Sequence, residues 1–353
     1  MATPIEAVGL SKVYMSRFGT RRITALGGID LRVEQGQVFG LLGPNGAGKT
    51  TTVKILLGLT RPTSGSASLL GLPASNPESR RRVGYLPEGH RFPGYLTARQ
   101  TLTIFGRMSG MDSALVRRRA PELLERVRLS EWADVRVKKF SKGMTQRLGL
   151  AAAMIHDPEV LLLDEPTDGV DPVGRREIRD LLQEEARRGK TVLLNSHLLS
   201  EIERTCDRVA VLRGGRVAAA GRIEELTASG SRYKLVATGV DDVLLAAFRE
   251  TGASVQRVNG HFDLSARDLD HVNALVDRLR AAGGKLQELT PLRTSLEDVF
   301  VDLVRESGGG AHGAPPNPQS GGGAHGAPPS PQSGGGAHGA PPSPPGPTSE
   351  RPS

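Results

Sequence analysis

A glycine-rich segment, GPNGAGKT at residues 43–50, constrains the fold of this chain more than any other feature. It follows the apolar run 38–42, which is typical of a buried strand, and it precedes apolar residues that fit the start of a helix. Glycines let successive backbone N–H groups curl round phosphate oxygens, while Lys49 reaches the outer phosphates and the hydroxyl of Thr50 faces Mg²⁺. A plain glycine turn would not need this lysine and hydroxyl in register. We therefore predict a nucleoside triphosphate site whose phosphate contacts come from Gly43, Pro44, Asn45, Gly46, Ala47, Gly48, Lys49, Thr50 and Thr51.

Composition places the chain among ordinary globular proteins. Its 353 residues are 37% hydrophobic and 24% charged, which is enough for two domains with sizeable cores. No apolar stretch approaches the roughly 20 residues that a bilayer-spanning helix needs, and the first residues lack the apolar core of a secretory signal. The single cysteine, Cys206, fits a reducing compartment and is expected to serve packing. We expect a cytoplasmic protein.

The net charge of +8 is distributed along the chain rather than concentrated in one segment. Basic and acidic residues are interspersed, and aromatic residues make up only 4% of the sequence. This pattern is typical of a solvated, mildly basic surface. Contact with anionic lipid or nucleic acid stays open, but no specific nucleic acid partner is expected.

Residues 1–228 alternate apolar runs with helical patterns, which predicts an α/β fold with a mostly parallel sheet covered by helices. The runs Val38–Leu42, Val160–Leu163 and Thr191–Leu194 are almost continuously apolar, as expected of strands buried on both faces. Gly214 and Gly215 separate two further runs and predict a hairpin at the end of this domain. Helical patterns between about residues 88 and 150, such as 121–129, predict a helical subdomain.

Residues 229–305 form a second unit with a β-α-β-β-α-β pattern. This order predicts a small α+β accessory domain of the ferredoxin-like type. Ser295 and Asp298 resemble a capping box that opens a final amphipathic helix carrying Leu296, Val299 and Phe300.

Residues 306–353 repeat a 13-residue unit rich in Gly, Pro and His, beginning SGGGAHGAPP. Almost no side chain in this tail can offset the entropy of ordering, so a disordered spacer is predicted. The histidine that recurs in each unit could bind a metal, but a flexible chain makes a poor preformed site.

Polar residues follow two of the predicted strands where each strand ends. Asp164 and Glu165 follow the run at 160–163, and His197 follows the run at 191–194 by three residues. Parallel strands end at the same edge of a sheet, where α/β proteins bind their ligands. Taken singly, the carboxylates could be a charged strand exit and His197 a structural histidine. Together with the phosphate loop, they favour an enzyme that acts on a terminal phosphate.

Four segments in this order resemble one family. These are GPNGAGKT, FSKGMTQR at residues 140–147, LLLDEPTDGVDP at residues 161–172, and His197. The chain is similar, over most of residues 5–225, to the nucleotide-binding subunits of ATP-binding cassette (ABC) transporters. The resemblance implies a phosphate-loop ATPase fold over residues 1–228, with a helical subdomain at about 88–150, and ATP and Mg²⁺ as ligands.

The resemblance also assigns roles to single residues. It implies that Asp164 supports the metal with Thr50, that Glu165 is the general base for the attacking water, and that His197 contacts the γ-phosphate. Lys49 then counts among the catalytic residues because it stabilises charge on the transferred group. Tyr14 is predicted to stack on adenine, although Phe18 competes for this role and a core aromatic is the alternative.

Two positions depart from the family's pattern. The usual Leu-Ser-Gly-Gly-Gln signature reads FSKGM here and retains Ser141 and Gly143, which we expect to bind nucleotide; Gln146 and Arg147 match what usually follows. Ser141 can still cap a helix whose N-terminal amides offer an anion site. Glu88 stands where the family commonly has a glutamine, and we expect it to contact Mg²⁺.

In this family the phosphate loop of one subunit and the signature of another close over the same ATP. The resemblance therefore implies a dimer with a second ATPase subunit, expected to be a homodimer, and a separate integral membrane permease. It places the chain peripherally at the cytoplasmic face of the membrane and favours export. The alternative is a soluble ABC ATPase acting on ribosomes or DNA, although such relatives commonly carry two cassettes or a coiled-coil insertion. A GTPase is disfavoured because no Asn-Lys-x-Asp motif is present.

Overall fold

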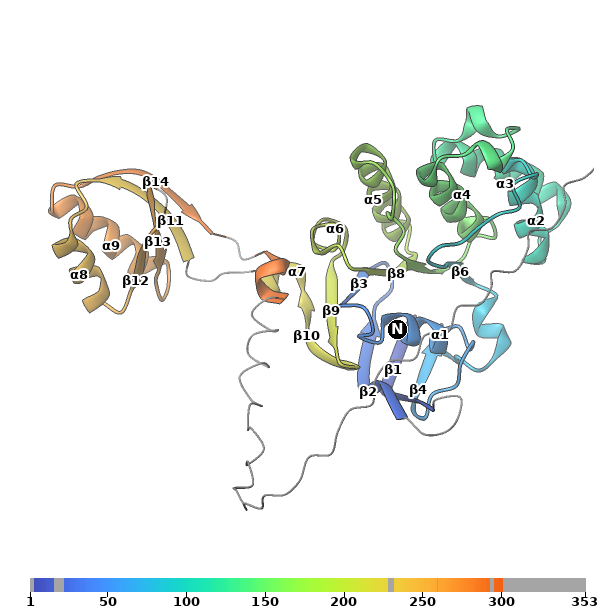
Figure 1. The fold of residues 1–353 in the computed structure, drawn as a ribbon, viewed down its shortest axis with the longest axis horizontal. Coiled ribbons are helices and arrows are strands. Elements are labelled where there is room, and N and C mark those ends of the chain that lie inside the picture. The colour runs from blue at the N-terminus through green and yellow to red at the C-terminus, as the bar shows by residue number, and fades with distance from the viewer. Residues whose placement is uncertain (1–2, 16–21, 228–231, 259, 293–294, 301–353) are drawn as a thin grey trace, which may run out of the picture. The chain divides into compact units, whose positions relative to one another are not determined.

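The computed structural model describes residues 3–15, 22–227, 232–258, 260–292 and 295–300 (Figure 1). The strands of this part of the chain form three sheets. The repeat segment predicted to be a disordered spacer, its three histidines and Phe18 all lie outside the described residues.

The largest sheet has six strands in the order β10-β9-β3-β8-β7-β6. All its neighbours pair in parallel except β9 and β10, which form the antiparallel hairpin predicted at Gly214 and Gly215. The predicted parallel sheet is confirmed, and β8 extends beyond Leu194 to include Asn195 and Ser196. The strands are β3 (Val38–Leu42), β6 (Val83–Leu86), β7 (Val160–Asp164), β8 (Thr191–Ser196), β9 (Arg208–Arg213) and β10 (Arg216–Arg222).

Both faces of this sheet are buried. Along β7, Leu161 and Leu163 belong to one hydrophobic cluster, while Val160 and Leu162 belong to another on the opposite face. Each fully buried leucine contributes about 1.5–3 kcal/mol through removal of apolar surface from water. Burial on both faces explains why these strands lack an alternating pattern. Helices of the same domain are α1 (Lys49–Leu56), α5 (Pro172–Arg187), α6 (Leu199–Thr205) and α7 (Ile223–Thr227).

A second, antiparallel sheet has the order β2-β1-β4-β5. Its strands are not evident in the sequence because register shifts in the β1 pairings interrupt the two-residue alternation, and Gly9 and Gly28 adopt positive φ angles of 56° and 88°. The strands are β1 (Ile5–Met15), β2 (Arg22–Val33), β4 (Ser64–Leu69) and β5 (Leu72–Pro73).

Three helices gather beyond β6, which is the edge strand of the large sheet (Figure 1). The bounds expected for a helix at residues 121–129 are wrong: α3 begins at Ser113, and Pro121 lies inside it. The carboxylate of Asp112 accepts the N–H of Ala114 and so caps the helix eight residues earlier than expected. The helices are α2 (Ala98–Met108), α3 (Ser113–Arg126) and α4 (Lys142–Met154), with 3₁₀ turns η1 (Pro77–Arg80), η2 (Ser130–Trp132) and η3 (Val137–Lys139).

The third sheet has the order β12-β13-β11-β14 and is antiparallel throughout. Strand β13 lies between β11 and β12, the two strands that α8 connects, so the unit is a split βαβ arrangement of the ferredoxin-like type. It has a hydrophobic core of its own, which includes Phe248, Leu264 and Leu275. Its elements are β11 (Arg232–Thr238), α8 (Asp242–Glu250), β12 (Ser254–Val258), β13 (His261–Ser265), α9 (Leu269–Ala281) and β14 (Lys285–Pro291).

Residues 296–300 are helical and begin with the predicted capping box. The Oγ of Ser295 accepts the N–H of Asp298 at 3.1 Å, and the Asp298 carboxylate accepts the N–H of Ser295 at 3.0 Å. Leu296 is 1% exposed and belongs to the hydrophobic cluster of the large sheet. None of the helices within the described ranges is long and apolar enough to cross a bilayer.

Candidate active site

The phosphate loop connects β3 to α1 and contains glycines that no other residue could replace without movement. Gly43 has φ 152°, and a Cβ there would lie 2.3 Å from the carbonyl oxygen of Leu212. Gly48 has φ 112° and precedes α1, and a Cβ there would lie 2.5 Å from the side chain of Leu26. The loop therefore turns sharply, and the free N–H groups at the start of α1 face the space that it encloses.

Lys49 is the first residue of α1, and its side chain folds back over this loop. Its Nζ donates to the carbonyl oxygens of Gly43 and Pro44. The side chain is buried, and burial lowers the pKa of Lys49, while Glu165, Asp164 and Glu88 oppose that shift by Coulomb attraction. The ammonium thus lies within the field of three carboxylates.

Asp164 and Asn195 are paired across the adjacent parallel strands β7 and β8. The side-chain amide of Asn195 donates to the Asp164 carboxylate at 3.3 Å. Asp164 is only 4% exposed, and burial raises its pKa, with smaller contributions from Glu88 and Glu165. The sequence-based expectation that these strand ends would bring polar groups together is realised here by backbone register.

Glu165 follows β7 in the left-handed backbone region, with φ 50°. This conformation costs a non-glycine residue about 1–3 kcal/mol and persists only where surrounding contacts enforce it. One carboxylate oxygen accepts the hydroxyl of Ser196 at 3.1 Å, and the other lies 2.7 Å from Nδ1 of His197. The carboxylate is buried, whereas the His197 side chain is 55% exposed and so has room to turn towards a ligand.

These residues line one cavity of about 480 Å³. It brings together predicted residues from four separate parts of the sequence: the loop, Glu88, the end of β7 and the residue that follows β8. Residues of β2 that the sequence did not single out complete one wall. The lining residues are Ile23, Thr24, Ala25, Pro44, Asn45, Gly46, Ala47, Gly48, Lys49, Thr50, Thr51, Glu88, Asp164, Glu165 and His197.

Tyr14 lies beside this cavity rather than in its lining. It pairs with Ile23 across β1 and β2, and Ile23 does line the cavity. The ring is 37% exposed, and Nζ of Lys12 lies 4.9 Å from its centroid. An adenine that stacked on Tyr14 would use the edge of the cavity formed by these two strands.

Ser141 and Gly143 also lie outside the lining of this cavity. Ser141 caps α4, since its Oγ accepts the N–H of Met144 at 3.2 Å. Lys142, which replaces a glycine of the usual signature, lies 2.7 Å from the carboxylate of Asp168. The predicted helix cap is therefore present, and the structure does not bring it to the phosphate loop of the same chain.

Sequence reasoning gave no role to Asn195, Ser196 or Gln146, although Asn195 and Ser196 contact the predicted carboxylates and Gln146 contacts the backbone of Glu165. Asn195 and Ser196 could have been identified because they end the strand that precedes His197. Gln146 contacts Glu165 through a backbone carbonyl, and no spacing rule marks such a contact.

The donor set suits Mg²⁺ and a triphosphate. Thr50, Glu88 and Asp164 offer oxygen atoms only, which are the ligands that Mg²⁺ prefers. The described residues hold no group of three or more His, Cys, Asp or Glu placed to bind a metal by themselves. Magnesium in phosphoryl-transfer sites usually takes one or two carboxylates and completes its shell with water and substrate phosphates. A cation is also needed to balance the three carboxylates before a polyphosphate can enter.

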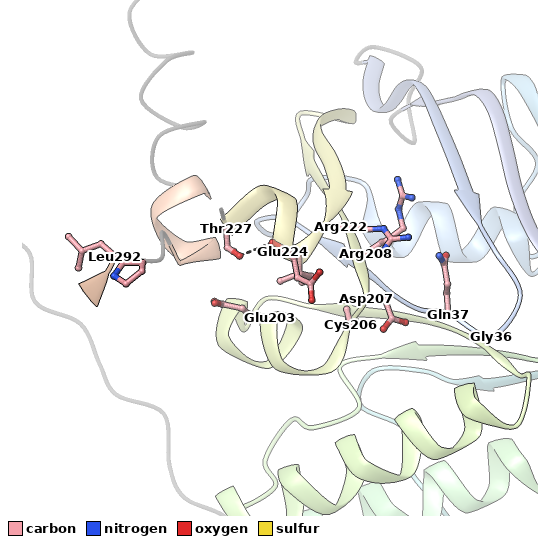
Figure 2. A pocket seen from close by; sticks show the side chains of 12 residues that line it. Gly36, Gln37, Glu203, Cys206, Asp207, Arg208, Arg222, Glu224, Thr227 and Leu292 are labelled. Carbon is pink, nitrogen blue, oxygen red and sulfur yellow. Dashed lines mark hydrogen bonds between the residues drawn. The ribbon is translucent and has the colours of Figure 1, made fainter. Parts of the chain in front are cut away.

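A larger cavity of about 910 Å³ lies elsewhere, along the start of β9 and the end of β10 (Figure 2). Its lining includes Arg208 and Arg222 as well as Glu203, Asp207 and Glu224, but no residue of the phosphate loop. Size alone does not make it the reaction site. The smaller cavity holds the glycine loop, the lysine and the strand-end carboxylates, and so it is the candidate active site.

The chain is similar to several known proteins. Residues 26–168 match the family model described as ABC transporter. The chain is 37% identical, over 87% of its length and 86% of the relative's, to an uncharacterised ABC transporter ATP-binding protein of Synechocystis sp.. It is 43% identical to the Nod factor export ATP-binding protein I of Paraburkholderia xenovorans, covering 85% of this chain and 97% of that one. Among solved structures, it is similar to a dimeric ATP-binding cassette in a post-hydrolysis state bound to ADP and Pi, with 25% identity and a TM-score of 0.56 over 62% of this chain and 98% of that one.

Proposed function

Because this chain belongs to the ATP-binding proteins of ABC transporters, we propose that it powers an exporter by hydrolysing Mg-ATP at the cavity of the phosphate loop. The chain is an ATP-binding ATPase subunit of this family, whose cassettes dimerise and work with a membrane component. The observation that carries our assignment of the site is the convergence of Lys49, Asp164 and Glu165 on one cavity.

Each residue has a role in the proposed reaction. The loop amides and Lys49 hold the outer phosphates, and Thr50, Asp164 and Glu88 would hold Mg²⁺, which supplies charge neutralisation when bound. Glu165 orients the attacking water and accepts its proton. His197 is held by Glu165 and can turn to the γ-phosphate. The positioning of these groups and their charges account for the rate, since the protein does little covalent work.

The working unit that we propose is a homodimer. Ser141 caps α4 and Gly143 follows it, but neither lines the cavity of its own subunit. In our proposal the backbone amides at the N-terminus of α4 bind the phosphates of an ATP held by a partner copy. One chain therefore supplies half of each of two sites, and Tyr14 would receive the adenine beside β2.

Export and location rest on the relatives. The sequence similarity to a Nod factor export ATP-binding protein extends over most of this chain. We propose that the chain lies at the cytoplasmic face of the membrane beside a separate permease. Action on ribosomes or DNA gains no support from the relatives described above. We further propose that residues 1–228 are the ATPase domain, with about 88–150 as its helical subdomain, residues 229–305 an accessory domain and residues 306–353 a spacer.

Replacing Glu165 by glutamine tests the proposed site. The amide preserves shape and polar contacts but accepts no proton, so Glu165→Gln should keep ATP binding and lower kcat by about 100-fold or more. Because binding continues without hydrolysis, Mg-ATP should convert the purified full chain into a dimer measurable by light scattering. Unchanged turnover would remove Glu165 from its role.

Lys49→Ala complements Glu165→Gln by testing the binding of the phosphates. It should abolish both nucleotide binding and hydrolysis, because it removes the cation that faces the outer phosphates. A Lys49→Ala variant that still formed the ATP-dependent dimer would contradict the placement of the phosphates in this cavity.

A further inference from the structure

Gln146 lies in the second turn of α4 and contacts the residue that we assign as the base. Its side chain is 8% exposed, and its Nε2 donates to the backbone carbonyl oxygen of Glu165 at 2.9 Å. This bond joins the helix that Ser141 caps to the chain segment that follows β7. It is a buried contact between a helix and the turn that follows the next strand along the chain.

The carbonyl of Glu165 does not need Gln146 to satisfy its hydrogen-bonding capacity. It already accepts the backbone N–H of Asp168 at 3.2 Å, and the N–H of Glu165 donates to Asn195 at 3.0 Å. Loss of Gln146 would leave no orphaned backbone oxygen, so the cost expected of a buried unpaired group does not arise. The amide instead adds a second, side-chain anchor to a backbone that is already paired.

Anchoring matters here because Glu165 holds an unfavourable backbone conformation. Its φ of 50° directs the carboxylate towards Ser196 and His197, at the wall of the phosphate cavity. A residue in this region relaxes to a more common conformation unless several contacts prevent it. Gln146 contributes a contact to this peptide group from helix α4.

We propose that Gln146 is a positioning residue for hydrolysis, which holds the peptide group of Glu165 so that its carboxylate faces the nucleotide. This inference rests on the proposed role of Glu165 as the base. It has a further consequence for the dimer. Helix α4 begins at the Ser141 cap. A nucleotide held by the partner subunit and bound at this cap would therefore contact the same helix that holds Glu165 of this chain.

The test replaces Gln146 by methionine, which has a similar length and volume but no N–H donor. In the full chain, Gln146→Met should lower kcat by at least tenfold, because a displaced base loses much of the 10²–10⁴-fold that general base catalysis contributes. KM for ATP should stay within about threefold, because no phosphate contact changes. Mg-ATP should still produce the dimer by light scattering, as for Glu165→Gln.

A double-mutant cycle separates positioning from general damage. In the Glu165→Gln background, Gln146→Met should cause no more than a twofold further loss of kcat, since the two residues act as one unit. Gln146→Glu is a second variant of nearly the same shape, and its carboxylate cannot donate when ionised. It should lower kcat in the same way, and because its carboxylate is buried it should also melt at a lower temperature than Gln146→Met.

Gln183→Met is the matched control. The amide of Gln183 also donates to a backbone carbonyl, that of Arg204 at 3.3 Å, but on α5 and away from the cavity lining. It should leave kcat within twofold. A kcat within twofold of the parent for both Gln146 variants would overturn the proposal, as would equal losses in both backgrounds. If Glu165→Gln itself kept full turnover, the assignment of the base would fail instead, whatever Gln146 showed.

Discussion

Single residues of the active site carry charge where little solvent can stabilise it. Asp164 is almost completely buried, and its pKa is raised by burial first and by Glu88 and Glu165 second. Burial disfavours the charged form of Lys49 as well, and because Lys49 is a base this lowers its pKa. Functional sites commonly retain such groups at the expense of stability. The nucleotide-free chain should therefore become more stable when one of these charges is removed.

Asp164→Asn tests this trade-off. An acid whose pKa is higher in the folded than in the unfolded chain binds protons more tightly when folded, so ionisation costs stability. The cost is absent below the unfolded value of 3.8, grows as pH rises to the folded value, and is complete above it. At pH about 7.5 the variant should melt higher, by about 2–4 °C for each kcal/mol gained, while it loses hydrolysis.

The pH dependence of this gain provides the check. Thermal unfolding of nucleotide-free protein should show the difference between variant and parent shrinking as the pH falls towards about 4. Asp180→Asn is the control, because the Asp180 side chain is 61% exposed and should show little difference at either pH. A gain for Asp164→Asn that stayed constant down to that pH would contradict the electrostatic explanation.

At the scale of whole elements, α4 combines two roles that the usual alanine substitution cannot separate. The Ser141 hydroxyl caps the helix, and we propose that the same residue binds a partner's nucleotide. Ser141→Ala removes both and should cost about 1 kcal/mol of stability. Ser141→Asp keeps a good cap, but its carboxylate would repel phosphate.

The two variants should therefore separate stability from function. Ser141→Asp should melt within about 1 °C of the parent yet lose ATP-dependent dimerisation measured by light scattering. Asp241→Ala removes a comparable cap from α8, where Asp241 accepts the N–H of Leu244 at 2.8 Å, and should lower the melting temperature alone. If Ser141→Asp dimerised normally with Mg-ATP, the residue would be a helix cap without a nucleotide contact.

The sequence predicted the elements that build the site better than the contacts within it. Strands buried on both faces and a loop with fixed residue types produce strong local patterns, so the sequence predicts β3, β7 and β8. The contact of Gln146 with Glu165 is not predictable in this way, because it depends on how α4 packs against the turn after β7. The start of α3 at Ser113 differs from the predicted start at residue 121, because a proline is typical of the first turn of a helix whereas Pro121 lies inside α3 and Asp112 is the cap.

At the scale of the whole molecule, the described chain comprises three sheets, and one short segment connects distant parts of the sequence. Residues 296–300 follow the last strand of the third sheet, yet Leu296 is buried in the hydrophobic cluster of the large sheet. The backbone N–H of Leu296 also donates to the carboxylate of Glu203 on α6 at 3.3 Å. The end of the described chain thus contributes to the stability of its first domain, which no local pattern in either region indicates.

Leu296→Ala tests that contribution. Truncating a fully buried leucine usually costs about 2–5 kcal/mol, from lost transfer free energy and from the cavity left behind. In urea denaturation the variant should lower the free energy of unfolding of the part of the chain that contains the large sheet by an amount in this range. Its kcat at low temperature should stay unchanged, because Leu296 does not line the nucleotide cavity. Leu269→Ala is the matched control, because Leu269 is 62% exposed and its truncation should cost less than about 0.5 kcal/mol. Equal effects of the two substitutions would show that residues 296–300 do not pack stably on the ATPase domain in solution.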